Sequence, residues 1–397
     1  MADAPPEEIE IELVDLAPRG DCIAQGDDGK PVYVAGGIPG ERVRVRVYKR
    51  GRLFTGADLL EVVRPSPHRV EPPCPMYGHC NGCQLQHVSA AHQLEIKRDL
   101  VVRELKTIGG FEAPPVPATI GADDPWHYRN HARFTVRHGW LGFVRRQRRS
   151  FFIVPQCLIM EPRINALLTA LHGRIGHTTQ CNIRVGADDD AIAIQPKLEL
   201  EDVESGQAYI DERLGGHSFR VSTAAFFQVH RAQAERMLAL VCDWVRQAPP
   251  GVVIDAYAGV GTFAAALADD GREVIAIEES GPAVRDAKHN LAAMPHITIE
   301  LGRAENILLK YADAGQQVAA VVLDPPRSGC YPTAIDAVAR LRPHMVVYVS
   351  CDPATLARDL KMLCARGFEL VVVQPLDMFP QTIHIECIAV LRRTEAR

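Results

Sequence analysis

The C-terminal half of the chain alternates apolar strands with helices, and this pattern constrains the fold more than any other feature. From about residue 216 onward, the apolar runs GVVIDAYAG, REVIAIEES, VAAVVLDPP and HMVVYVSCDP are separated by helical segments such as PAVRDAKHNLAAM. Continuously apolar strands that alternate with helices are typical of a parallel sheet covered on both faces. We therefore predict a doubly wound, Rossmann-like α/β domain over residues 214–397.

Two β-rich regions precede that domain. Residues 9–64 contain short strands and Gly-rich turns, and the run from Arg42 to Val47 alternates arginine with valine. This predicts an OB-like barrel over residues 1–66 that buries the valines and displays the arginines. Strand patterns after Tyr128 predict a small β-rich central domain formed by residues 67–90 and 120–213. Helical periodicity that ends at two glycines predicts a helix within residues 91–119.

Composition and charge narrow the class of protein. The 397 residues are 47% hydrophobic and contain no uncharged apolar stretch long enough to cross a membrane. The acidic first residues lack the pattern of a secretory leader, which predicts a cytoplasmic location, where the eleven cysteines stay reduced. The net charge of −5, taken over the whole chain, argues against binding to nucleic acid. Two arginine-rich runs nevertheless predict local contacts with RNA, and the alternative is that both are solvated surfaces. These runs are Arg42, Arg44, Arg46, Lys49, Arg50 and Arg52, then Arg129, Arg133, Arg137, Arg145, Arg146, Arg148 and Arg149.

A Gly-rich turn after the first strand of the α/β domain indicates a nucleotide-like cofactor. Residues 255–262 read DAYAGVGT, and Glu278 ends the next strand, where a carboxylate can accept hydrogen bonds from ribose hydroxyls. There is no third glycine of a dinucleotide fingerprint, and Asp255 precedes the turn. A carboxylate there suits the cationic end of S-adenosylmethionine better than a pyrophosphate. A dinucleotide or a purely structural turn is the alternative.

Two further strand ends carry groups suited to methylation of a pyrimidine. Asp324 and Arg327 lie in the stiff loop DPPR, and Cys351 follows the strand VVYVS. Carbon 5 of uracil becomes nucleophilic only after a thiolate adds to carbon 6, and a base must later remove the carbon-5 proton. Glu386, within the apolar strand HIECIAVL, is the expected base. His384 is the alternative base or a packing residue.

Three cysteines in the order Cys74-x5-Cys80-x2-Cys83 form a cluster ahead of the central strands. A zinc ribbon has two paired C-x2-C motifs, whereas only one pair is present here. One pair, a third cysteine and a remote fourth fit a four-thiolate iron–sulfur cluster better. The expected fourth ligand is Cys157, in the strand FFIVPQCLI.

Taken together, these residues resemble the RNA uridine-5-methyltransferase family that modifies tRNA and bacterial 23S rRNA, over nearly the whole chain. SCDPATLARDL and MFPQTIHIE resemble its nucleophile and base motifs, which implies Cys351 as nucleophile and Glu386 as proton acceptor. The resemblance also implies a TRAM-type barrel, packing of helix 91–108 on the catalytic domain and 23S rRNA as a more expected target than tRNA. The protein is expected to act as a monomer. The remaining implied residues are the S-adenosylmethionine contacts Gln228, Tyr257, Glu278 and Asp324, and the 4Fe–4S ligands Cys74, Cys80, Cys83 and Cys157.

The chain departs from the family pattern at His230, which follows FFQV where the family commonly has asparagine. Cys330, beside the DPPRSG loop, is a second thiol that we interpret as structural. Two other functions stay open from sequence. A cytosine-5 methyltransferase uses the same thiolate chemistry but typically has a Pro-Cys pair where this chain has DPPR, and a non-catalytic RNA-binding protein would not need both Cys351 and Glu386.

Overall fold

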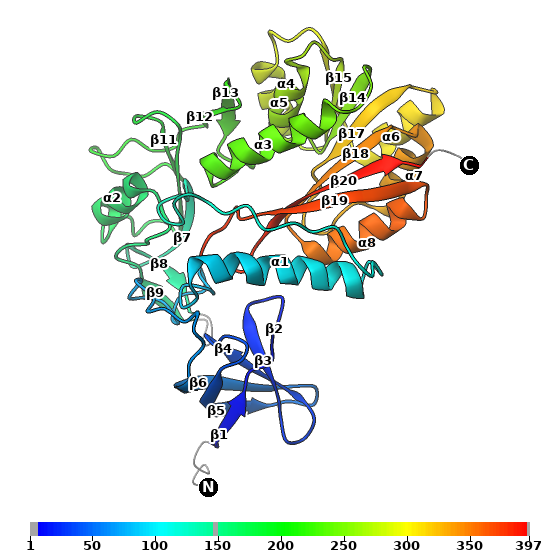
Figure 1. Cartoon of the computed structure of the whole chain (residues 1–397). Coiled ribbons are helices and arrows are strands. Elements are labelled where there is room, and N and C mark those ends of the chain that lie inside the picture. Colours follow the sequence, from blue (N-terminus) through cyan, green and yellow to red (C-terminus); the bar gives the residue numbers. More distant parts are fainter. Residues whose placement is uncertain (1–6, 146–149, 395–397) are drawn as a thin grey trace.

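The computed structural model describes residues 7–145 and 150–394 and divides into three regions (Figure 1). An N-terminal sheet, blue in Figure 1, lies on one side of helix α1 (Ala90–Thr107), and the large C-terminal sheet lies on the other. A smaller central region lies beside the N-terminal and the C-terminal sheets. No helix among the described residues is long and apolar enough to span a membrane.

The N-terminal region is a six-stranded sheet in the order β1-β5-β6-β4-β3-β2. All neighbouring strands are antiparallel except β4 and β6, and contact between β1 and β3 shows that the sheet curls around its core. Val43 and Val45 are fully buried while the arginines between them are exposed, as the alternation predicts. The strands are β1 (Glu8–Glu12), β2 (Asp15–Leu16), β3 (Asp21–Gln25), β4 (Pro31–Ala35), β5 (Arg42–Arg50) and β6 (Thr55–Arg64).

The exposed arginines of β5 are matched by glutamates, which the sequence interpretation of a free basic face missed. Strand β1 reads EIEIE and pairs antiparallel with β5, so the glutamates share the face of the arginines. Exposed pairs of this kind contribute little stability, about 0–1 kcal/mol each, but they neutralise the surface. The ion pairs of β5 are Arg42–Glu10, Arg44–Glu61, Arg46–Glu8 and Arg50–Glu7, and Arg64 at the end of β6 pairs with Glu12.

The central region is a five-stranded antiparallel sheet in the order β11-β10-β7-β8-β9, packed against one helix. Of the second arginine-rich run, Arg146, Arg148 and Arg149 lie outside the described residues. The elements are β7 (His131–Arg137), β8 (Trp140–Val144), β9 (Phe151–Ile153), α2 (Pro162–Leu171), β10 (Gln180–Val185) and β11 (Ile192–Gln195).

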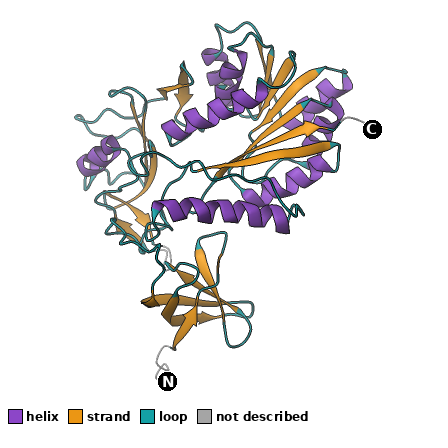
Figure 2. Cartoon of the chain, in the orientation of Figure 1, coloured by secondary structure: helices purple, strands orange, loops and turns teal. Residues whose placement is uncertain are grey.

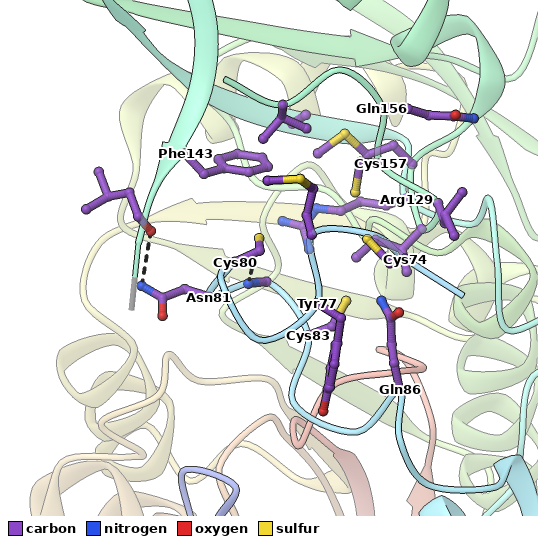
Figure 3. A pocket seen from close by; sticks show the side chains of 18 of the residues that line it. Cys74, Tyr77, Cys80, Asn81, Cys83, Gln86, Arg129, Phe143, Gln156 and Cys157 are labelled. Atoms are coloured by element: carbon purple, nitrogen blue, oxygen red, sulfur yellow. Dashed lines mark hydrogen bonds between the residues drawn. The ribbon is translucent and has the colours of Figure 1, made fainter. Parts of the chain in front are cut away.

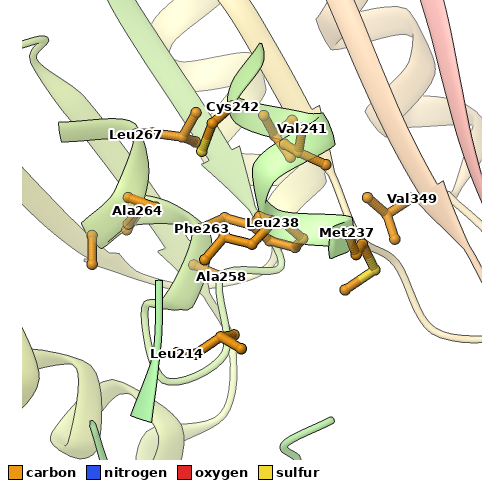
Figure 4. Packing of buried hydrophobic residues seen from close by; sticks show 14 of the residues in the cluster. Leu214, Met237, Leu238, Val241, Cys242, Ala258, Phe263, Ala264, Leu267 and Val349 are labelled. Carbon is orange, nitrogen blue, oxygen red and sulfur yellow. The ribbon is translucent and has the colours of Figure 1, made fainter. Parts of the chain in front are cut away.

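The C-terminal region is a seven-stranded sheet in the order β16-β15-β14-β17-β18-β20-β19, with β20 antiparallel to both neighbours. Helices α3, α4 and α5 contribute to the buried cluster on one face, and α6, α7, α8 and α1 contribute to the other (Figure 2). In the first cluster, Met237 and Leu238 of α3 pack beside Phe263 of α4 (Figure 4). The strands are β14 (Val252–Ala256), β15 (Val274–Glu278), β16 (Ile297–Leu301), β17 (Val318–Leu323), β18 (Met345–Ser350), β19 (Phe368–Leu376) and β20 (Glu386–Arg393); the helices are α3 (Arg231–Val245), α4 (Thr262–Ala268), α5 (Gly281–Asn290), α6 (Ala304–Asp313), α7 (Pro332–Leu341) and α8 (Pro353–Cys364).

A hairpin of β12 (Tyr209–Leu214) and β13 (His217–Ser222) precedes α3 and packs on α5. Its buried residues Ile210 and Phe219 belong to the C-terminal core, so the hairpin crosses the boundary expected at residue 214. Helix α1 packs on α8 and β19, although it precedes the central strands in the chain.

Candidate active site and cysteine pocket

The Gly-rich turn follows β14 at the carboxyl edge of the parallel strands, where open α/β sheets bind ligands. Tyr257, Gly259 and Gly261 all have positive φ, of 69°, 58° and 93°. A Cβ atom at Gly261 would lie 2.7 Å from Leu291 Cδ1, whereas one at Gly259 would meet nothing within 4 Å. Gly261 is therefore needed for the close approach to Leu291, and the space at Gly259 is open to a ligand.

Glu278, at the end of β15, faces this turn. Its Oε2 accepts a hydrogen bond from the backbone N–H of Gly259 at 2.8 Å, and its Oε1 accepts one from the N–H of Ser280 at 2.7 Å. These two bonds fix the carboxylate at the turn, next to the open space above Gly259.

Asp255 and Asp324 are carboxyl groups at the ends of β14 and β17; Asp255 is fully buried and Asp324 is half-buried. Burial, and then the nearby Asp324, raises the pKa of Asp255 to about 8, and burial raises the pKa of Asp324 to about 7. Neither oxygen of Asp255 accepts a hydrogen bond of ordinary geometry from the described residues. A buried carboxyl group without partners is costly, so this pair favours a cationic ligand at the same edge.

Cys351 and Glu386 face each other across strands β18 and β20. The last pair of that antiparallel ladder is Ser350 with Cys387, so the next positions opposite each other are Cys351 and Glu386. Side chains at facing positions share one face of the sheet, with Cβ atoms about 4.5–5.5 Å apart. The register therefore brings together two residues that are 35 positions apart in the sequence.

The electrostatics of this pair are set by burial and by Arg327. Burial, then Glu386, raises the pKa of the Cys351 thiol to about 11, while the Arg327 guanidinium acts in the opposite direction. Burial, then Asp324, raises the pKa of Glu386 well above its usual value, and Arg327 again opposes the shift. Arg327 is thus the cation that favours both ionised forms, a role that the sequence did not assign to it.

His384 was the alternative base, and Cys330 was interpreted as a structural thiol near the site. Burial, then Arg327, lowers the pKa of His384 to about 4, and its Nδ1 lies 3.5 Å from Arg327 Nη2. Cys330 is buried, with its sulfur 3.7 Å from the hydroxyl of Tyr257, and burial raises the pKa of its thiol to about 12. The hydroxyl of Tyr257 therefore contacts the thiol of Cys330.

Gln228 and His230 lie between β13 and α3. Gln228 is half-buried, and its backbone carbonyl accepts a hydrogen bond from Asn130 Nδ2 at 3.2 Å. His230 caps helix α3, since its Nδ1 accepts a hydrogen bond from the N–H of Gln233, and its ring stacks on Tyr128 at 4.7 Å. His230, which stands where the family commonly has asparagine, therefore acts as the N-cap of α3.

The four predicted cluster cysteines line one pocket of about 350 Å³ between the 74–83 segment and the central sheet. Figure 3 shows the sulfur atoms of Cys74, Cys80, Cys83 and Cys157 around a shared open space. Among the described residues, no three His, Cys, Asp or Glu side chains converge closely enough for a single metal ion. The four thiols therefore share one pocket without forming a ready-made site for a single metal ion.

Sequence reasoning missed the residues that hold the loop before Glu386. Gln93 and Lys97 are buried, and they bond to Gln381 and Asp377 of that loop. In the sequence, this role could have been recognised from two polar residues, Gln93 and Lys97, spaced i, i+4 beside the apolar positions of a helix.

Comparisons with known proteins agree with this geometry. Residues 192–394 match the family model described as tRNA (Uracil-5-)-methyltransferase. The chain is 31% identical to an uncharacterized RNA methyltransferase of Gloeobacter violaceus, over 97% of this chain and 96% of that protein. A similar protein of Oceanobacillus iheyensis is 32% identical, over 96% of this chain and 95% of that protein.

Among solved structures, the chain is similar to the Pyrococcus abyssi tRNA (uracil-54, C5)-methyltransferase in complex with S-adenosyl-L-homocysteine. The TM-score is 0.76 at 23% identity, and the match covers 96% of this chain and 100% of that chain. The shared fold thus extends over all three regions. By its sequence match and its relatives, the chain belongs to the tRNA (uracil-5-)-methyltransferase family, whose members are RNA methyltransferases.

Proposed function

We propose that the protein methylates carbon 5 of a uridine in structured RNA, with Cys351 as nucleophile and Glu386 as proton acceptor. The observation that carries this proposal is the register of β18 and β20, whose last pair, Ser350 with Cys387, makes Cys351 and Glu386 the next positions opposite each other. A thiol that must add to carbon 6 and a carboxylate that must reach the proton on carbon 5 need such proximity, because the two carbons are bonded neighbours.

Residues of this chain carry out the addition to the ring and the removal of the proton. The Cys351 thiolate, favoured by Arg327, forms a bond to carbon 6 of the ring, and the electron pair moves toward carbon 5. S-adenosylmethionine supplies the methyl group that carbon 5 takes. Glu386 then accepts the proton from carbon 5, the double bond re-forms, and the carbon–sulfur bond breaks to free Cys351.

S-adenosylmethionine is the cofactor that the residues at the sheet edge fit. The unpartnered carboxyl group of Asp255 and the half-buried Asp324 suit its positive charges, and Glu278 beside Gly259 suits its ribose. Tyr257 and Gln228 complete the proposed set of contacts. The related Pyrococcus protein binds S-adenosyl-L-homocysteine, which supports the same cofactor here.

The cysteine pocket is proposed to hold a 4Fe–4S cluster through Cys74, Cys80, Cys83 and Cys157. Four thiols that line one pocket support this ligand set. All eleven cysteines of the chain are free thiols, which agrees with a cytoplasmic location. The cluster would hold the 74–83 segment against the central sheet.

The N-terminal sheet is proposed to be a TRAM-type RNA-binding barrel, but its contacts differ from those first expected. The arginines of β5 are neutralised, so the turn from Lys49 to Phe54 is the more suitable surface. There Lys49 lies 5.0 Å from the ring centre of Phe54, and Leu53 is 78% exposed. On the central sheet, Arg137 and Arg145 lie over phenylalanine rings, which leaves their charge available to phosphates.

The target is proposed to be 23S rRNA, with tRNA as the competing substrate, and the protein to act as a monomer. Mapping of 5-methyluridine in both RNAs from cells with and without the protein tests the target. Loss of the modified base from 23S rRNA alone supports the proposal, and loss from tRNA alone overturns it.

The mechanism is tested with the pair Cys351→Ala and Glu386→Gln. Cys351→Ala is expected to abolish methyl transfer and any covalent complex with 5-fluorouridine RNA. Glu386→Gln is expected to add and methylate but to stall as an adduct with ordinary uridine RNA, because the last proton cannot leave. Its turnover is expected to fall by about two to four orders of magnitude. Full turnover by Glu386→Gln, or an adduct formed by Cys351→Ala, contradicts the assignment. Methylation of cytosine instead of uridine would indicate the cytosine-5 alternative, and no methyl transfer to any RNA would indicate a binding protein.

A further inference from the structure

The loop of residues 377–384 joins β19 to β20 and leads directly into Glu386. Its backbone turns sharply at Gln381, where φ is 70°. Asp377, Gln381 and Thr382 in this loop are polar and each no more than 4% exposed. Buried polar groups need partners, and here many of the partners come from outside the C-terminal domain.

The segment after Cys83 holds the loop through its backbone. The N–H groups of Gln84 and Leu85 both donate to the carbonyl oxygen of Gln381, at 3.1 and 3.0 Å. The side-chain oxygen of Gln84 accepts a hydrogen bond from the N–H of Ile383 at 3.3 Å. The chain that carries a predicted cluster ligand is thus bonded to the loop at the very next residues.

Helix α1 holds the same loop through two buried side chains. Gln93 and Gln381 exchange two hydrogen bonds of 3.1 Å, one from Gln93 Nε2 to Gln381 Oε1 and one from the Gln381 N–H to Gln93 Oε1. Lys97 is fully buried, forms an ion pair with Asp377 and donates to the carbonyl oxygen of Phe379 at 3.1 Å. Removal of either side chain leaves a buried polar group without its partner.

The other two regions also contact the loop. The hydroxyl of Tyr128, ahead of the central sheet, donates to the carbonyl oxygen of Pro380 at 3.0 Å. Ile383 is part of the buried core of the N-terminal sheet, and a Cβ atom at Gly20 of that sheet would lie 3.5 Å from Ile383 Cβ. The loop is therefore the point where all three regions meet.

We propose that Gln93, Lys97 and the Gln84–Leu85 backbone form a clamp on loop 377–384 that positions Glu386 for removal of the carbon-5 proton. The clamp links Glu386 to the cysteine pocket through the peptide that follows Cys83. The inference rests on the proposed role of Glu386. Gln93 and Lys97 are positioning residues, since they contact the loop and act on the reaction only through it.

The test follows the release of a covalent adduct on ordinary uridine RNA. Gln93→Leu is expected to keep S-adenosylmethionine affinity within about twofold of wild type and to form the methylated adduct, but to release it at least about tenfold more slowly. Gln381→Gly is expected to show the same effect, because glycine suits the positive φ and keeps the backbone bonds to Gln84, Leu85 and Gln93 Oε1, while it removes the side-chain oxygen that accepts from Gln93 Nε2. Asp99→Asn, on the exposed side of α1, is the matched control and is expected to behave as wild type.

The outcomes separate this inference from the proposed function. If Gln93→Leu and Gln381→Gly release product at the wild-type rate while Glu386→Gln stalls, the clamp is wrong and the base is right. If Glu386→Gln itself turns over fully, the proposed base is wrong. Equal loss of adduct formation, release and cofactor binding in both clamp variants would make Gln93 a support of the fold only, and would overturn the inference.

The link to the cysteine pocket has a readout that is independent of activity. Cys157→Ser changes the pocket without altering the Cys83–Leu85 peptide. Hydrogen exchange of the amides of Gln381 and Ile383 is expected to be about tenfold faster in this variant than in protein purified with its iron, because the 74–85 segment loses its anchor. Unchanged exchange at both amides would show that the clamp holds without the pocket and would remove the link.

Discussion

Asp255→Asn tests whether the buried carboxyl group below the Gly-rich turn recognises the positive charge of S-adenosylmethionine. The pKa of Asp255 is raised to about 8 by burial and by Asp324, so the free protein holds it largely protonated below neutral pH. A cation binds the ionised form, and the apparent affinity falls with the fraction of protein in that form. With that pKa, the ionised fraction is about one in a thousand at pH 5 and about one in ten at pH 7.

Wild-type affinity for S-adenosylmethionine is therefore expected to rise about tenfold for each pH unit between pH 5 and 7, or about a hundredfold in total. If Asp324, with its pKa raised to about 7, must also ionise, the rise is steeper below pH 7. Equilibrium dialysis with labelled cofactor measures the slope. Asp255→Asn is expected to lower it by about one log unit per pH unit, and Asp270→Asn, beyond the end of α4, is the matched control. A flat wild-type profile, or an equal slope in Asp255→Asn, refutes the reasoning.

The same raised pKa makes a linked prediction for stability without cofactor. A carboxyl group whose pKa is higher in the folded than in the unfolded state stabilises the fold fully only below the unfolded value, about 3.9. That contribution is lost as the pH rises toward the folded pKa of about 8. Thermal unfolding of the cofactor-free protein is therefore expected to show decreasing stability from pH 5 to 8, and Asp255→Asn to show a smaller decrease. An equal decrease in both proteins would contradict the shift.

Three further predictions concern the other regions. Anaerobically purified protein is expected to contain about four irons per chain and to absorb broadly near about 400 nm; stoichiometric zinc without iron would defeat the cluster. Replacing Arg44 and Arg46 with glutamine is expected to leave RNA affinity and its salt dependence almost unchanged, whereas the double variant Lys49→Ala, Arg52→Ala is expected to lower both. A filter-binding titration measures both quantities. A larger loss of affinity in the Arg44 and Arg46 variant would show that the β5 arginines contact phosphates. Arg69→Met is expected to lower the free energy of unfolding in urea by about 3–5 kcal/mol, because it leaves the fully buried carboxylate of Glu41 without its ion-pair partner. A loss below about 1 kcal/mol would show that the Glu41 carboxylate becomes solvated in the variant.

The sequence predicted the C-terminal sheet and the edge on which its groups meet, because apolar strands that alternate with helices leave few topologies. Asp255 lies at the carboxyl end of β14, and Asp324 and Cys351 directly follow β17 and β18, so their common edge follows from the direction of these parallel strands. The facing positions of Cys351 and Glu386 did not follow from the sequence. They depend on β20 entering antiparallel and in one register beside β18, and a shift of one residue would turn Glu386 to the other face.

In the N-terminal sheet, the sequence likewise did not predict the charge of the exposed face. A period of two in RVRVRV predicts correctly which side chains are exposed, since it depends on the strand itself. It does not identify the strand beside it. The glutamates of β1 have the same period, and pairing Glu8 with Arg46 converts a predicted phosphate-binding face into a nearly neutral one. Net charge along a strand is therefore a poor guide to a binding surface until the neighbouring strand is known.

Helix α1 packs against both the N-terminal sheet and the C-terminal domain. Gln93, Lys97, Val101 and Leu105 follow one another at intervals of four and form a single stripe, of which the polar half holds loop 377–384 and the apolar half enters the C-terminal core. Ile96 and Leu100 form a neighbouring stripe that enters the core of the N-terminal sheet together with Ile383. Because the two stripes lie on one rigid helix, a displacement of the N-terminal sheet moves the loop before Glu386 as well. The proposed contact of the N-terminal sheet with RNA is therefore expected to be coupled to the position of the proposed base through the packing of helix α1.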